Sequence, residues 1–229
     1  MTAAPTAQEE TLALLRDDLV TGQLPPGSQV LQQSLALRYG VSRVPLREAL
    51  KVLEGEGHLV HHRHRGYFVS ELSVADLVEV YRLRELLEAE AISLAVPRLK
   101  DGDLHALVAA AGEVEQCGAS GDLAGLTVAN RRFHFLLFEV SHSPRLVRLL
   151  RQLWDTTDVY RGVYFAQRPN RDRIEREHRQ LIAALDQRLT EEAIEVQAAH
   201  RDHSVATVRA LIESGVLQSN LVRQTAATG

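Results

Sequence analysis

The fold is decided by residues 24–69, LPPGSQVLQQSLALRYGVSRVPLREALKVLEGEGHLVHHRHRGYFV. Two prolines and a glycine near its start predict an extended turn over residues 24–30. The spacing of apolar residues then predicts a short helix over residues 32–39 that ends at Gly40. A second helix is predicted from its N-cap, Ser42, to about residue 56. These signals describe two short helices joined by a tight turn.

The following segment, residues 58–70, predicts a hairpin, because the short β-like runs HLVHH and GYFVS lie on either side of a turn. Two short helices followed by a hairpin make a winged helix-turn-helix. In the second helix, four apolar residues at helical spacing are expected to face inward: Leu46, Ala49, Leu50 and Leu53. The opposite face carries Arg43, Arg47 and Lys51 at positions i, i+4 and i+8.

This cationic face is typical of a helix that enters the major groove of DNA. An arginine can bond O6 and N7 of guanine together, whereas a lysine meets phosphate as a point charge. Ser42 can donate to a phosphate, and at the hairpin tip Gly66 permits close backbone approach while Arg65 suits a narrow minor groove. A solvated helix face is the alternative, but the surrounding helix-turn-helix and hairpin favour DNA contact.

The composition excludes a disordered or fibrous chain, because 45% of the 229 residues are hydrophobic and 24% are charged. The single cysteine, Cys117, excludes an intramolecular disulfide and any zinc site built on two thiolates. The net charge is −4, yet residues 36–66 carry +3. A basic segment on an acidic body indicates two parts with different partners, although ordinary charge variation also gives this pattern. The polar start and the lack of a long apolar run predict a cytoplasmic protein with no membrane partner.

After residue 71 every periodic segment is helical, so the chain is predicted to be mainly α. The expected helices span residues 73–96, 101–117, 121–141, 144–163, 170–187 and 190–214. The first of them has an apolar stripe that we expect to be buried: Leu77, Val80, Leu83, Leu87, Ala91 and Leu94. The resulting domains are residues 1–72, the winged helix-turn-helix, residues 73–217, an all-α bundle, and a flexible tail over residues 218–229.

Four polar residues in the bundle have the types and spacing of a metal site. Asn130 and His134 lie at i and i+4 of one helix, so they share a face, while His178 and His200 lie on two later helices. Three imidazoles and an oxygen donor could hold a transition-metal ion inside a bundle. From spacing alone, satisfied core or surface histidines are the favoured alternative. His203 is either a substitute ligand or, more in keeping with its spacing, a surface residue.

Residues 24–69 resemble the DNA-binding domain of GntR-type bacterial transcription regulators. The resemblance is carried by the pattern G-V-S-R-x-P-x-R-E-A-L, here Gly40–Leu50, and by R-G-x-x-V, here Arg65–Val69. It implies that Arg43, Arg47 and the wing pair Arg65-Gly66 are the operator-reading positions.

Residues 74–215 resemble the FCD ligand-binding domain of the FadR-like subfamily. The matching motifs are Arg84–Glu88, Asn130–His134, Glu177–His178 and the closing His200. The resemblance implies an antiparallel bundle of six or seven helices that holds a divalent metal, zinc or nickel, on a carboxylate and three histidines, beneath a cavity for a small organic acid. Asn130 replaces the frequent Asp, which removes a negative charge and weakens the expected site.

Arg84 is the residue expected to bind the effector's carboxylate, because its guanidinium fork matches a carboxylate bidentately. A salt bridge to Glu88 at i+4 is an equally good interpretation and does not exclude the first. The sequence thus predicts a bacterial repressor, not an enzyme, that binds a palindromic double-stranded DNA operator as a homodimer. Its bundle would bind effector and metal and form the dimer. The alternative is a metal-dependent enzyme that uses the three histidines, against which the motifs H-E-x-x-H and G-x-S-x-G are missing.

Overall fold

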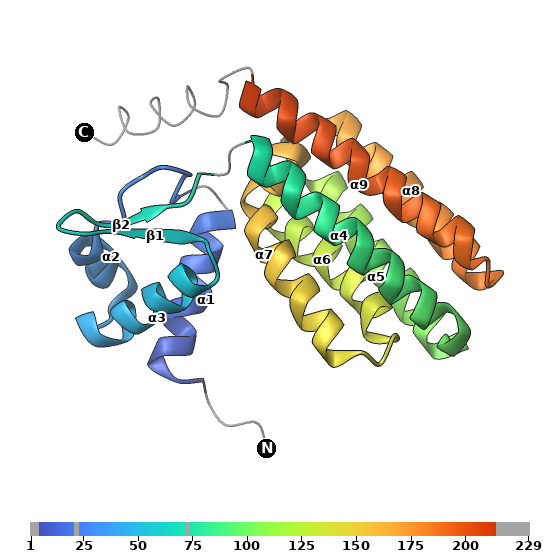
Figure 1. Cartoon of the computed structure of the whole chain (residues 1–229), viewed down its shortest axis with the longest axis horizontal. Coiled ribbons are helices and arrows are strands. Elements are labelled where there is room, and N and C mark those ends of the chain that lie inside the picture. The colour runs from blue at the N-terminus through green and yellow to red at the C-terminus, as the bar shows by residue number, and fades with distance from the viewer. Residues whose placement is uncertain (1–4, 21–22, 72–73, 214–229) are drawn as a thin grey trace. The chain divides into compact units, whose positions relative to one another are not determined.

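The computed structural model describes residues 5–20, 23–71 and 74–213 (Figure 1). The chain divides into two compact units, Met1–Leu72 and Ser73–Gly229. The predicted flexible tail, residues 218–229, lies outside the described residues. Among the described helices, none is long and apolar enough to cross a membrane.

The N-terminal unit is a winged helix-turn-helix, as predicted. Its elements are α1 (Ala7–Val20), α2 (Gln32–Tyr39), α3 (Arg43–Gly55), β1 (Leu59–His62) and β2 (Gly66–Val69). Gly40 ends α2 in the left-handed conformation, with φ of 65°, which a side chain would strain. The strands pair antiparallel in a register that sets Leu59 opposite Val69 and His62 opposite Gly66. The extended segment before α2 lies beside β2, where the Val30 N–H donates to the Tyr67 carbonyl at 2.8 Å.

The core of this unit forms where α1 packs against α3. The four residues of α3 that were expected to face inward are all buried: Leu46, Ala49, Leu50 and Leu53. Leu15 and Leu19 of α1 are buried as well. Because the apolar side of α3 is committed to this core, the cationic side of the same helix is left in solvent.

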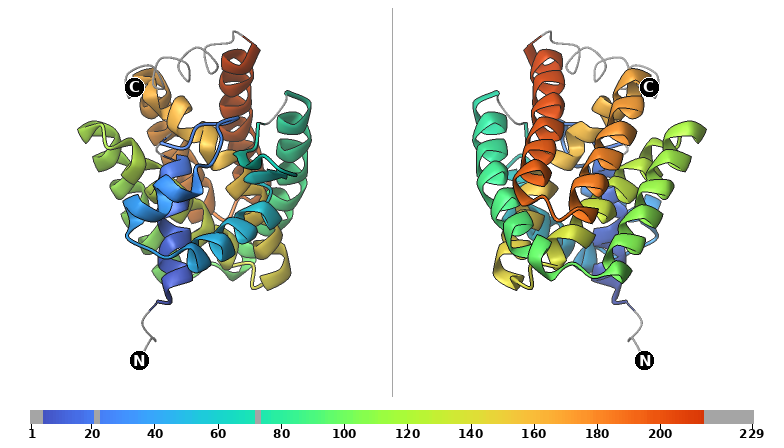
Figure 2. Two further views of the ribbon diagram at one scale, coloured as in Figure 1. Left: turned by 90° about the vertical axis from the view of Figure 1, so that its left-hand side faces the viewer. Right: turned by 90° about the vertical axis from the view of Figure 1, so that its right-hand side faces the viewer.

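The C-terminal unit is a helical bundle, also as predicted. Its elements are α4 (Val74–Ala95), the short 3-10 turn η1 (Val96–Arg98), α5 (Asp101–Ser120), α6 (Leu123–Glu139), α7 (Pro144–Ala166), α8 (Arg168–Asp186) and α9 (Thr190–Glu213). Short connections make successive helices run in opposite directions, and Figure 2 shows them packed side by side. α4 contacts α6, α7 and α9, so it borders much of the interior. The core includes Ile92, Phe133, Phe138 and Trp154.

The buried face of α4 differs from the predicted stripe. Leu77 and Ala91 are buried as expected, but Leu83 is 44% exposed. The face that turns inward instead carries Arg84 and Glu88, both fully enclosed. The predicted stripe was wrong here because the interior beside α4 contains an ion pair. The spacing of apolar residues cannot identify a buried helix face that carries charged side chains.

Candidate functional site

The predicted DNA-contacting residues of α3 share one exposed face. Arg43, Arg47 and Lys51 are all exposed, opposite the buried stripe. The ammonium of Lys51 donates to Oε1 of Glu48 at 2.9 Å, so its charge is partly compensated within the helix. Ser42 occupies the N-cap position with extended backbone, but its hydroxyl makes no capping hydrogen bond. The predicted N-cap position is therefore confirmed, and the exposed hydroxyl, which makes no capping bond, can donate elsewhere.

The tip of the hairpin presents Arg65 in a defined position. Its guanidinium carbon lies 5.0 Å from the ring centroid of Phe68, a cation–π contact. Its carbonyl accepts a hydrogen bond from the amide of Gln29 at 2.7 Å. Gly66 has φ of 86°, and no heavy atom lies within 4 Å of the point that a Cβ would occupy. Glycine is required there by the backbone conformation, and the open space leaves room for close approach of a partner.

The structure brings the three predicted histidines together inside the bundle. His134 comes from α6, His178 from α8 and His200 from α9, and all three are buried. One ring nitrogen from each lies within 4.8 Å of the others. The Nε2 atoms of His134 and His178 are 3.3 Å apart. Their convergence from three helices is what the spacing alone could not establish.

The geometry and protonation of this cluster fit a metal ion. Two imidazoles on one tetrahedral zinc, each at about 2.0–2.1 Å, have nitrogens about 3.3 Å apart, which matches the measured separation of His134 and His178. Burial, with further contributions from neighbouring cations, lowers the pKa of His134 well below 6.5. Burial and the nearby His200 lower the pKa of His178 likewise. Both rings are therefore neutral at pH 7, the form that binds metal.

Glu177 orients one of these ligands, and the sequence interpretation assigned it no such role. Its Oε2 accepts a hydrogen bond from Nδ1 of His200 at 2.7 Å, which fixes the orientation of that ring. Its Oε1 is 2.7 Å from Nδ1 of His203. Burial raises the pKa of Glu177, but the hydrogen bonds from these histidines outweigh it, and the net shift is downward. His203 thus pairs with Glu177 and does not join the cluster.

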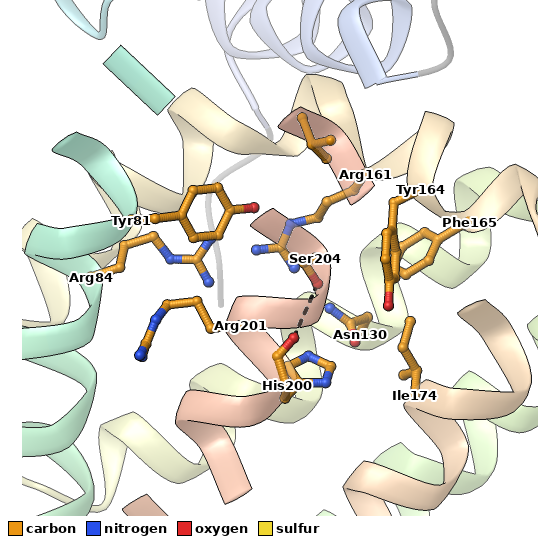
Figure 3. A pocket seen from close by; sticks show the side chains of 11 residues that line it. Tyr81, Arg84, Asn130, Arg161, Tyr164, Phe165, Ile174, His200, Arg201 and Ser204 are labelled. Carbon is orange, nitrogen blue, oxygen red and sulfur yellow. Dashed lines mark hydrogen bonds between the residues drawn. The ribbon is translucent and has the colours of Figure 1, made fainter. Parts of the chain in front are cut away.

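Asn130 lies one helical turn before His134 on α6 and is almost completely buried. Its Oδ1 has no hydrogen-bond partner among the described residues. An unpaired buried amide oxygen is costly, so this oxygen can still accept a hydrogen bond or bind a cation. Asn130 and His200 both line a small cavity, with a volume of about 20 Å³ (Figure 3). The structure therefore places a neutral amide oxygen at the same cavity as His200, and its role as a metal ligand stays a prediction.

Arg84 lines the same cavity and also makes the salt bridge that the sequence allowed. Its Nε and Nη2 donate to Oε1 of Glu88 at 2.9 and 2.8 Å, and its Nη1 donates to the hydroxyl of Thr157 at 3.0 Å. Glu88 also accepts from Trp154 and Gln197. Burial raises the pKa of Glu88, but Arg84 and the other donors lower it further, so this carboxyl stays ionised. Both interpretations of Arg84 are compatible with its position.

Two cavity residues were not found from the sequence, Arg161 on α7 and Arg201 on α9. Both are buried. Arg201 directly follows His200, and Arg161 is two turns beyond Trp154, so helical spacing from those landmarks could have located them. Apolar periodicity assigns arginines to the surface, so it does not identify Arg161 or Arg201 as cavity residues.

A winged helix-turn-helix joined in one chain to a helical bundle with a buried polar cavity defines a DNA-binding regulator with a sensory unit. Family models agree. Residues 7–69 match the bacterial regulatory proteins of the gntR family, and residues 79–203 match the FCD domain. The chain belongs to the GntR family of bacterial transcription regulators and carries the FCD domain of its FadR-like subfamily.

Relatives and solved structures are consistent with this assignment. The chain is 28% identical over 202 residues to the transcriptional regulator YdhC of Bacillus subtilis, covering 88% of this chain and 90% of that protein. It is 32% identical over 140 residues to the regulator McbR of Escherichia coli, 61% of this chain and 63% of that one. The solved structure of E. coli McbR/YncC superposes with a TM-score of 0.82 at 25% identity, over 91% of this chain and 100% of that one. The chain is thus a transcriptional regulator, and the enzyme alternative is set aside.

Proposed function

We propose that this regulator is a homodimeric repressor that binds a palindromic operator and releases it when a small organic acid enters the bundle. Arg43 and Arg47 read bases, Lys51 and Ser42 contact phosphate, and the wing pair Arg65-Gly66 approaches the adjacent minor groove. One winged unit covers only a few base pairs, so a two-fold dimer is needed for useful affinity, and its symmetry requires a palindromic site.

The observation that carries the sensory part is the convergence of three buried imidazoles within 4.8 Å, two of which, His134 and His178, have a pKa well below 6.5. His134, His178 and His200 would hold a divalent transition metal, with Asn130 as oxygen donor. When bound, the ion supplies positive charge next to the cavity, which attracts a carboxylate. Arg84, held in place by Glu88 and Thr157, receives the acid at the other side of the cavity. The effector shifts the operator-binding equilibrium only if the DNA-free state binds it more tightly.

Metal content is the deciding measurement for the sensory site. Protein purified without chelator should contain about one zinc, nickel or manganese ion per chain by elemental analysis, and added metal should raise the melting temperature. The variants His134→Ala and His178→Ala should lose the ion and the effector response while operator binding without effector stays close to wild type. If the purified protein contains no metal and none of the three ions raises its melting temperature, the cluster is a polar pocket and not a metal site.

The dimer and the operator are tested separately. Light scattering should give twice the chain mass of 25.5 kDa. Gel shifts with a symmetric site should show salt-sensitive, specific retention. A monomer at working concentrations would contradict the dimer, and equal retention of any DNA sequence would contradict an operator-specific repressor.

A further inference from the structure

Helix α3 carries an exposed apolar side chain on its cationic face. Val44 is 71% exposed, whereas Leu53 is completely buried. Nine residues, or about two and a half helical turns, separate them, so the two side chains lie on opposite sides of the helix. Arg47 and Lys51 follow Val44 at i+3 and i+7 and share its face. Val44 therefore projects from the middle of the side that faces away from the core.

The side chain of Val44 is also held in a fixed direction. It is the second residue of α3, and Pro45, the third, restricts the backbone of this first turn. Valine is β-branched and has one strongly preferred rotamer in a helix, so contact with a partner costs it little side-chain entropy. Helix formation does not explain a valine here, because its helix propensity is lower than that of alanine or of the unbranched side chains.

The major groove of DNA offers a partner of matching chemistry. Base pairs present hydrogen-bond donors and acceptors there, and their one apolar feature is the C5 methyl group of thymine. The residues of a recognition helix that contact base edges are those near its N-terminus. The arginines beside Val44 can bond to donors and acceptors but leave such a methyl group without a contact, whereas an exposed valine can cover it.

We propose that Val44 is a specificity-determining residue that packs against the C5 methyl group of one thymine in each half of the operator. Val44 and Arg47 are about 4.5 Å apart along the helix axis, and successive base pairs are about 3.4 Å apart. The thymine therefore lies within two base pairs of the base that Arg47 reads. Its methyl group and the methyl groups of Val44 leave water together, which favours thymine over cytosine at that position.

This inference rests on the proposed function, because it assigns a further residue to the same operator-reading face. The wild-type, full-length protein first selects its operator from a pool of random duplex DNA. Each thymine of the half-sites is then replaced in turn by deoxyuridine, which pairs as thymine does and lacks only the C5 methyl group. Gel shifts at one fixed salt concentration give the Kd of each duplex.

The variant is Val44→Ala, which removes both methyl groups of the side chain. Because this side chain is exposed, the variant should melt as the wild type does. Leu14→Ala, at an exposed apolar position on α1, is the matched control.

Burial of one methyl group changes a Kd by about fourfold, so deoxyuridine at one position should raise the wild-type Kd about fourfold in one half-site and about 15-fold in both. Val44→Ala should bind the thymine operator more weakly than the wild type and should no longer distinguish thymine from deoxyuridine at that position. Leu14→Ala should keep the wild-type sensitivity.

Three outcomes overturn the role of Val44. They are a selected operator in which no thymine is sensitive to loss of its methyl group, a sensitive thymine more than two base pairs from the base that Arg47→Ala ceases to read, and a Val44→Ala protein that loses as much affinity on deoxyuridine substitution as the wild type. If the selected operator is bound specifically and any of these results is found, the proposed function stands and only the role of Val44 fails. If the selection yields no preferred sequence, operator-specific binding fails and the role of Val44 fails with it.

Discussion

Replacing Glu88 by Gln is the most direct test of the polar interior of the bundle. The carboxylate is completely buried and accepts hydrogen bonds from Arg84, from Nε1 of Trp154 at 2.8 Å and from Nε2 of Gln197 at 2.9 Å. Arg201 adds a longer-range contact at 3.7 Å. Gln preserves the size of the side chain and one acceptor oxygen, but it leaves Arg84 buried without its counter-charge.

The expected cost follows from that uncompensated charge. Removal of one partner from a buried ion pair costs about 3–5 kcal/mol. At about 2–4 °C per kcal/mol for a unit of this size, the melting temperature should fall by roughly 10 °C. The double variant Arg84→Met/Glu88→Leu should recover much of this loss, because it buries no unpaired charge.

The single tryptophan makes the assay specific for the bundle, since Trp154 is fully buried there and the N-terminal unit has none. Its fluorescence during urea or thermal unfolding reports the C-terminal unit alone. Glu90→Gln, an exposed position on the same helix, is the matched control and should change stability by less than about 0.5 kcal/mol. Equal stabilities of Glu88→Gln and this control, or losses that simply add in the double variant, would refute the reasoning.

Three further predictions concern DNA, metal and pH. Arg47→Ala should cost about 1–3 kcal/mol against the operator only, whereas Lys51→Ala should weaken all sequences alike, and gel shifts with specific and random DNA separate these outcomes. Asn130→Asp should tighten metal binding in a chelator competition, because a carboxylate replaces a neutral oxygen, and unchanged affinity would exclude this residue as a ligand. Chelated protein should lose stability below about pH 6.5, by up to about 1.4 kcal/mol per pH unit for each of His134 and His178, since only the unfolded rings take up protons there. Equal unfolding free energies at pH 7 and pH 5 would contradict the depressed pKa values.

The N-terminal unit was predictable because its determinants are local. Gly40 sets the left-handed end of α2, and the apolar spacing of α3 alone determines which side is buried. Gly66 supplies the positive φ at the wing. Each of these acts within a few residues of chain, so sequence patterns contain the information. Ser42 occupies the predicted N-cap position, although its hydroxyl makes no capping bond, because the position does not by itself orient a hydroxyl.

The bundle was predictable in its helices but not in the side that faces inward. The three histidines were selected by residue type and motif, and their convergence depends on how α6, α8 and α9 pack. Leu83 was misplaced and Arg161 was missed for the same physical reason. Arg84 and Glu88 pair within α4, and their burial also depends on Thr157, Trp154 and Gln197 from other helices, whereas apolar periodicity assigns charged residues to the surface.

Two independent features of the histidine cluster predict that a metal ion bound there would be held loosely. Asn130 contributes no charge, so the ligand set is neutral where a carboxylate would add attraction. The second feature is the small number of outer hydrogen bonds, each of which typically raises the metal affinity of a site by 10–100-fold. His200 donates such a bond to Glu177, but Nδ1 of His134 and of His178 makes none among the described residues. When the protein ligands are weak, the affinity of the site for the ion depends more on the acid that binds next to it. Effector and metal are then expected to increase each other's affinity by the same factor, as linkage requires.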